Sequence, residues 1–263
     1  MTALFLSELL KLKRQPGVLF WGFLAVPAAA LAFRIALEGF FLLRYGDFPQ
    51  ARTDMLVSAA QSLGIAGNPV AQLLYAIGVS SVFHVEYRFS TWRNLVPRAG
   101  RLPPLAAKFA VCLLCMAIGL GLTVVGDMML NAGLGLVGDG GSRAPAQAGG
   151  VLVLGAAFGI AFLELATLAA IVATLTLLFR SMIAAVIPVF LAGITCAMAQ
   201  AYFGAAIAGI PMPAFAADAA RAWLFAGAEG AYGVGGVGTL LAWLLAAMAA
   251  GCLVFSRQPL NTE

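Results

Sequence analysis

Six long apolar runs make up most of this chain, and only short polar passages separate them. A helix needs about 20 apolar residues to cross the hydrocarbon core of a membrane, and every run is long enough to do so. The sequence therefore predicts six transmembrane helices, near residues 17–38, 69–87, 104–130, 151–179, 182–207 and 232–255.

The composition supports a membrane protein built of helices. Hydrophobic residues make up 62% of the chain and charged residues 10%. A soluble domain carries roughly 25% charged residues. The strands of a membrane barrel would alternate apolar and polar residues over about ten positions, and the unbroken apolar runs exclude that pattern. We therefore expect an all-α integral membrane protein, with residues 1–263 forming a single transmembrane domain.

Basic residues are distributed unequally between the two sides of this predicted topology. Ten of the 15 fall on the side that holds both termini, and basic loops usually stay in the cytoplasm. We therefore expect both termini to be cytoplasmic, in a multi-pass protein of a bacterial-type inner membrane. The ten are Lys11, Lys13, Arg14, Arg88, Arg93, Arg98, Arg101, Lys108, Arg180 and Arg257.

Several chemistries lack the residues that they need in this sequence. A phosphate-binding loop requires Gly-Lys followed by Ser or Thr, and none of the three lysines follows a glycine. A single histidine, His84, is too few for a multi-histidine metal site, and no Gly-x-Ser-x-Gly nucleophile turn is present. No basic, solvent-facing surface for nucleic acid is visible. We expect no catalytic residue, metal site or cofactor on this chain.

Two carboxylates lie inside the third and fourth predicted spans. Glu164 lies near the middle of the fourth span. A charge there costs roughly 2.5–3.5 kcal/mol and usually faces the bundle interior or a cavity. It can relay protons or contact a polar substrate in a pathway, or it can join two helices through a hydrogen bond. Asp127, toward the outer end of the third span, is a weaker candidate for the same roles and can also reach the headgroup region.

The first 16 residues have two different faces when drawn as a helix. The apolar face holds Phe5, Leu6, Leu9 and Leu12, and the polar face holds Ser7, Glu8, Lys11 and Arg14. Two such faces favour a helix that lies flat on the inner membrane surface. We therefore expect an interfacial helix over residues 1–16, after which Pro16 and Gly17 turn the chain into the first span.

The polar passage between the second and third spans has the same two-faced pattern. Phe89, Trp92 and Val96 recur at helical spacing, and Pro97 ends the pattern. Topology explains the basic residues here but not the aromatic stripe. We therefore expect a short helix over 86–97 that contacts a partner, and a Lys108 side chain that reaches from the next span to the interface.

In these two passages the chain resembles the membrane subunits (permeases) of ATP-binding-cassette (ABC) transporters of the second exporter class. Those subunits begin with an amphipathic Ser-Glu-x-x-Lys-x-x-Arg-like helix, which here reads Ser7-Glu8-Leu-Leu-Lys11-Leu-Lys13-Arg14. Between spans two and three they carry a Glu-x-x-x-Gly/Ser-Thr-x-Arg/Lys-x-Leu helix and then Pro. This chain has Glu86-Tyr-Arg-Phe-Ser90-Thr91-Trp92-Arg93-Asn-Leu95-Val-Pro97, with Ser90 where the family often has Gly.

The resemblance implies a permease that works with a separate cytoplasmic ATPase dimer, which would bind ATP and Mg. Two permease copies, identical or related, would pair to form a substrate pathway, with export as the direction. The 86–97 segment would be a coupling helix lying on the ATPase, and the N-terminal helix would transmit part of its push. The implied interface residues are Glu86, Arg88, Phe89, Thr91, Trp92 and Arg93, and those of the interfacial helix are Glu8, Lys11 and Arg14.

Two other classes of protein stay open at this point. A proton-coupled carrier or a channel would work without ATP and would use Glu164 as its relay, although such carriers usually need more than one buried ionisable group. The third class is a membrane scaffold that does not transport.

Overall fold

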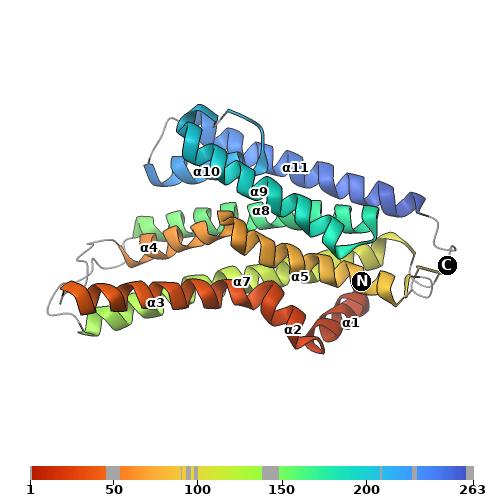
Figure 1. Cartoon of the computed structure of the whole chain (residues 1–263), viewed down its shortest axis with the longest axis horizontal. Coiled ribbons are helices and arrows are strands. Elements are labelled where there is room, and N and C mark those ends of the chain that lie inside the picture. The colour runs from red at the N-terminus through yellow and green to blue at the C-terminus, as the bar shows by residue number, and fades with distance from the viewer. Residues whose placement is uncertain are drawn as a thin grey trace.

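The computed structural model describes residues 2–45, 54–89, 91–92, 96–97, 100–137, 148–207, 209–226 and 230–258. Long helices run side by side along one axis, and no strand occurs in these ranges (Figure 1). The first helix and the end of the last helix lie at one end of the bundle, which we call the α1 end. The start of the last helix lies at the other, which we call the α4 end (Figure 1).

The helical elements whose bounds the structure gives follow one another along the chain. They are α1 (Thr2–Lys13), α2 (Pro16–Leu19), the π-helix η1 (Phe20–Leu24), α3 (Ala25–Tyr45), α4 (Met55–Ser62), the 3₁₀-helix η2 (Leu63–Gly67), α5 (Pro69–Arg88), α7 (Leu102–Val137), α8 (Ala148–Phe179), α9 (Met182–Phe203), the 3₁₀-helix η3 (Gly204–Ile207), α10 (Pro213–Ala226) and α11 (Gly230–Arg257).

Most of these helices are long and apolar enough to cross a membrane. Five qualify by length and composition: Pro16–Arg44, Leu102–Leu134, Gly149–Phe179, Met182–Phe203 and Gly233–Arg257. The bent pair Met55–Gly67 and Pro69–Arg88 makes a sixth if it is counted as one span. The chain is therefore an all-helical, multi-pass membrane protein, and these segments overlap all six predicted spans.

The second predicted span, 69–87, falls within α5, and the segment Met55–Gly67 meets α5 at a bend of 66° just before it. The helix on each side of the bend has its own N-terminal cap, because the Asp54 side chain accepts from the Leu56 amide and the Asn68 side chain accepts from the Val70 amide, both at 2.9 Å. Such caps satisfy amides that have no partner within the helix. Pro69 begins α5 at a position where its missing N–H costs nothing. The local sequence, through these two caps and Pro69, therefore favours a bend at this position.

The helix α8 lies at the centre of the bundle. It contacts α4, α5, α7, α9, α10 and α11, and residues 164–170 are all buried. By contrast, α9 and α11 leave most of their apolar surface exposed, as helices at the rim of a membrane bundle do. Any polar group in the middle of α8 must therefore find its partner on a neighbouring helix.

Helices α10 and α11 approach each other closely through glycine. A Cβ atom added at Gly236, on α11, would overlap the carbonyl oxygen of Ala216, on α10. Small residues permit such backbone contact between membrane helices. Gly238, two residues further along α11, has open space around it.

We predict that Gly236→Ala lowers the midpoint of thermal unfolding of the detergent-solubilised protein, because the added methyl pushes α10 away from α11. Gly238→Ala is the matched control, since alanine gains up to about 1 kcal/mol over glycine in a helix and here meets no neighbour. The close packing of α10 on α11 is contradicted if both variants unfold at the same temperature.

Candidate functional site

The face of α1 that packs on the bundle holds both apolar residues and a carboxylate. Phe5 and Leu9 pack against the core, Leu12 is buried, and Glu8 lies on the same face with only 6% of its surface exposed. The sequence pattern placed Glu8 on the polar face with Lys11, so its inward orientation differs from that prediction. A carboxylate buried alone would be costly, and its position requires a cation on the opposing helices.

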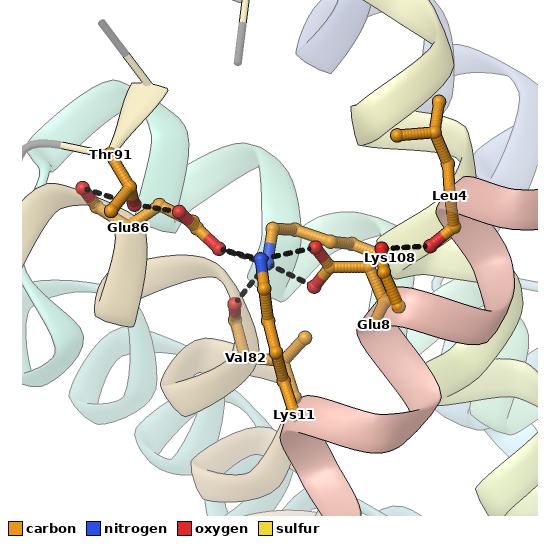
Figure 2. Close-up of polar contacts among 8 residues, drawn as sticks. Leu4, Glu8, Lys11, Val82, Glu86, Thr91 and Lys108 are labelled. Carbon is orange, nitrogen blue, oxygen red and sulfur yellow. Dashed lines mark hydrogen bonds and ion pairs between the residues drawn. The ribbon is translucent and has the colours of Figure 1, made fainter. Parts of the chain in front are cut away.

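Four charged side chains from three helices meet at this contact, and we call them the charge cluster: Glu8, Lys11, Glu86 and Lys108 (Figure 2). The Lys108 ammonium lies 2.6 Å from a Glu8 oxygen and 2.9 Å from a Glu86 oxygen. The Lys11 ammonium lies at the same two distances from Glu8 and Glu86. Two negative and two positive charges thus alternate and cancel.

Lys108 is the centre of the charge cluster. Its side chain has no exposed surface, and its ammonium also donates to the carbonyl oxygen of Val82, on α5, at 3.2 Å. The predicted reach of Lys108 to the membrane interface is not what the structure shows. Instead Lys108, on α7, contacts Glu8 on α1 and both Val82 and Glu86 on α5, so it joins these three helices.

Lys11 closes the cluster on its exposed side, since 45% of its side chain is accessible. Burial opposes its charge, but the hydrogen bonds and charges of Glu8 and Glu86 outweigh that effect and raise the pKa of Lys11 above its ordinary value. A raised lysine pKa favours the folded state at neutral pH, and this contribution is lost only as the pH rises through the raised pKa. Lys11 therefore stays charged under physiological conditions.

The expected 86–97 segment begins in the last turn of α5, and after a turn at Phe89 the residues Trp92, Val96 and Pro97 are helical again. Glu86 and Arg88 form the last turn of α5, and Phe89 follows with 64% of its surface exposed. The Arg88 guanidinium carbon lies 5.6 Å from the centre of the Phe89 ring, and Arg88 is exposed as well. Ser90 and residues 93–95, which include the predicted interface residue Arg93, lie outside the described residues.

The two remaining predicted interface residues turn inward. The Thr91 hydroxyl donates to the Glu86 carboxylate. Trp92 is 3% exposed, and its ring packs 4.7 Å from the ring of Phe255, near the end of α11. Within the predicted aromatic stripe, therefore, Phe89 faces outward and Trp92 is buried.

A cavity of about 220 Å³ opens between α1 and the end of α5. The charge cluster forms its polar floor, and Leu12, Val82 and Phe89 contribute apolar walls. Its other lining residues are Gln15, Val85 and Thr91. This arrangement offers a recess of mixed chemistry directly beside the exposed Phe89 ring.

Glu164 lies in a second polar cluster, in the middle of α8. The Arg221 guanidinium, on α10, donates to one of its oxygens at 2.5 Å, and the Gln72 amide, on α5, donates to the other at 3.2 Å. A second Arg221 nitrogen lies 2.5 Å from Asp218. A Cβ atom added at Gly67 would lie 2.5 Å from a guanidinium nitrogen of Arg221, so glycine leaves room for the arginine in its observed position. The contacts are those of a polar link between helices, and a role in substrate passage stays a prediction.

Asp127 lies in a third cluster, apart from Glu164. It pairs with Arg34, on α3, and accepts from Ser58 at 3.2 Å and from Asn131 at 2.7 Å. The cluster thus joins α3, α4 and α7. Sequence reasoning named Glu164 and Asp127 but not their partners Arg221 and Arg34, although a carboxylate in a span is itself a signal that a cation lies nearby. No group of three metal-ligating side chains occurs in the described part of the chain.

A family model described as "ABC-2 family transporter protein" matches residues 4–199, which contain most of α1, the charge cluster and Glu164. No curated protein and no solved structure matches the chain.

We predict that Lys108→Met costs about 3–5 kcal/mol of stability, because it leaves a buried carboxylate without its cation. Lys13→Met, on the exposed side of α1, is the matched control and should change little. Thermal unfolding in detergent measures both.

A second substitution identifies the cause of the loss. Adding Glu8→Gln to Lys108→Met restores the balance of Glu86 with Lys11, so the double variant should be more stable than Lys108→Met alone. A double variant that is less stable than Lys108→Met contradicts the account of the cluster as a balanced set of charges.

Proposed function

The chain belongs to the ABC-2 transporter permease family, and from this premise we propose that it is the transmembrane subunit of an ABC transporter whose ATPase is a separate cytoplasmic protein. The family match and the apolar helices support a permease. The sequence has no phosphate-binding loop, so ATP and Mg would be bound by the partner ATPase dimer. A second permease copy, identical or related, would complete the pathway.

The ATPase would dock at the α1 end, on residues 86–97. This proposal rests on the contrast between the exposed residues Arg88 and Phe89, which we call the tip, and the buried residues beside them, which hold the tip in place. Phe89 and Arg88 are exposed, whereas Glu86 and Trp92 are buried against other helices. We therefore assign Phe89 and Arg88 to direct contact with the ATPase, together with Arg93 from the sequence motif. Glu86, Thr91 and Trp92 would position this segment.

The charge cluster supports a mechanism for transmitting force. Closure of the ATPase dimer on ATP would push the tip, and a tip that moved alone would have to separate Glu86 from Lys11 and Lys108. Separating buried ion pairs costs several kcal/mol, so α1 and α7 would move with α5. These helices would then switch the pathway between inward and outward opening. The excess of basic residues at the α1 end supports a cytoplasmic position for this end, with export as the direction.

The exposed face of α1 supports its proposed place on the membrane surface. Leu6 and Leu10 expose more than half of their surface, and Lys13 and Arg14 lie beside them. Apolar side chains flanked by cations suit the headgroup boundary of the inner leaflet. On the opposite side of α1, the charges of Glu8 and Lys11 and the apolar residues that pack against the core would link this surface helix to the tip.

We predict that Phe89→Ser weakens binding of the ATPase subunit at least tenfold, because an exposed aromatic anchor is typical of residues that dominate an interface. The partner to test is the protein from a neighbouring reading frame that carries a Gly-x-x-x-x-Gly-Lys-Ser/Thr loop. Co-purification of the two proteins from membranes and titration in detergent would measure the change.

Phe179→Ser is the matched control, since Phe179 is also an exposed phenylalanine, at the end of α8. It should leave ATPase binding unchanged. The docking assignment is contradicted if Phe89→Ser binds as tightly as the unaltered chain, and the proposed function fails if no ATPase subunit binds the chain. Transport that needs only a proton gradient and is lost in Glu164→Gln would favour a carrier instead.

A further inference from the structure

The side chain of Arg101 binds the C-terminal end of α11. Arg101 follows residues 86–97, which we call the docking segment. One guanidinium nitrogen of Arg101 donates to the carbonyl oxygens of Phe255 and Ser256 at 2.8 Å and of Gln258 at 2.9 Å. The last carbonyls of a helix have no partner within it and carry partial negative charge. Arg101 therefore supplies both the hydrogen bonds and the charge that this helix end needs.

Residues of α5 and the docking segment contact the same helix end. Trp92 packs on the fully buried ring of Phe255, and the Tyr87 hydroxyl donates to the Gln258 side chain at 2.9 Å. The Gln258 amide in turn donates to the carbonyl oxygen of Leu177, on α8. Polar and aromatic contacts thus fix the end of α11 to residues on both sides of the exposed tip.

The rest of α11 is linked through α8 and α10 to the polar cluster around Glu164. Thr167 and Thr174, on α8, donate to the carbonyl oxygens of Leu240 and Ala247 at 3.2 and 2.8 Å. Near the α4 end, the glycine contact described above seats α10 directly on α11. Because α10 carries Arg221, any shift of α11 relative to α8 acts on the Arg221–Glu164 pair.

We propose that Arg101 and Trp92 are positioning residues that make α11 a second lever, which carries movement from the docking segment to the Arg221–Glu164 pair. This inference rests on the proposed function, because the movement is that of a permease driven by an ATPase. The charge cluster links the tip to α1 and α7, whereas Arg101 and Trp92 link it to α11 and, through α11, to α10. The two linkages touch where the Lys108 ammonium lies 5.9 Å from the centre of the Trp92 ring. Arg101 and Phe255 belong to the second linkage alone, so substitutions at these two residues separate it from the first.

The test uses the complex of the full chain with its ATPase in lipid nanodiscs. Spin labels on cysteines at Leu152 and Val234, exposed residues at the starts of α8 and α11, report their separation with and without ATP under conditions that block hydrolysis. In the unaltered complex, ATP should change this distance. In Arg101→Ala the change should be lost while ATPase binding is retained, and Arg101→Lys should restore part of it.

Arg257→Ala is the matched control, because Arg257 is an exposed arginine in the last turn of α11, and it should leave the ATP-dependent change intact. If Arg101→Ala does not fold, Phe255→Leu removes the ring that Trp92 packs on and should have the same effect. An undiminished distance change in the Arg101 and Phe255 variants overturns the lever but leaves the proposed function standing. Failure of the unaltered chain to bind any ATPase overturns both.

Discussion

A lysine with no exposed surface, placed between two carboxylates, is the constraint on which the α1 end depends. Lys108 cannot be buried without Glu8 and Glu86, and those carboxylates cannot be buried without Lys108 and Lys11. Each of these residues fixes the position of a helix, so α1, α5 and α7 are set relative to one another by charge neutrality. The exposed Phe89 tip is built on this base, next to a cavity whose floor is the same set of charges.

The same principle is repeated deeper in the bundle. Glu164 draws Arg221 and Gln72 to the centre of α8, and Asp127 draws Arg34 and Ser58 to α7. Lipid offers these groups no partner, so each pair ties together helices that apolar packing alone would leave free to slide. The molecule thus has ionic links at its α1 end and farther along the bundle, at Glu164 and Asp127. That arrangement would suit the proposed transmission of a push along the bundle.

Hydropathy was sufficient to locate the membrane helices, because a run of about 20 apolar residues favours a membrane-spanning helix wherever it lies in the chain. Local pattern was insufficient for the site. Glu8 borders both faces of α1, and only a cation on α7 decides which way it turns. Trp92 turns inward because Phe255, near the other terminus, offers its ring. Arg221 meets Glu164 across 57 residues, a pairing that composition can suggest but no local spacing reveals.

The central claim is that α1 and the end of α5 move as one body when the ATPase binds ATP. It is tested most directly by spin-label distances in the assembled transporter, from a cysteine at His84, a partly exposed residue near the end of α5, to one at Lys13, on α1, and to one at Ile183, on α9; Lys13 and Ile183 are exposed. The account predicts that ATP leaves the His84–Lys13 distance unchanged and alters the His84–Ile183 distance. A His84–Lys13 distance that changes as much as the other would contradict it.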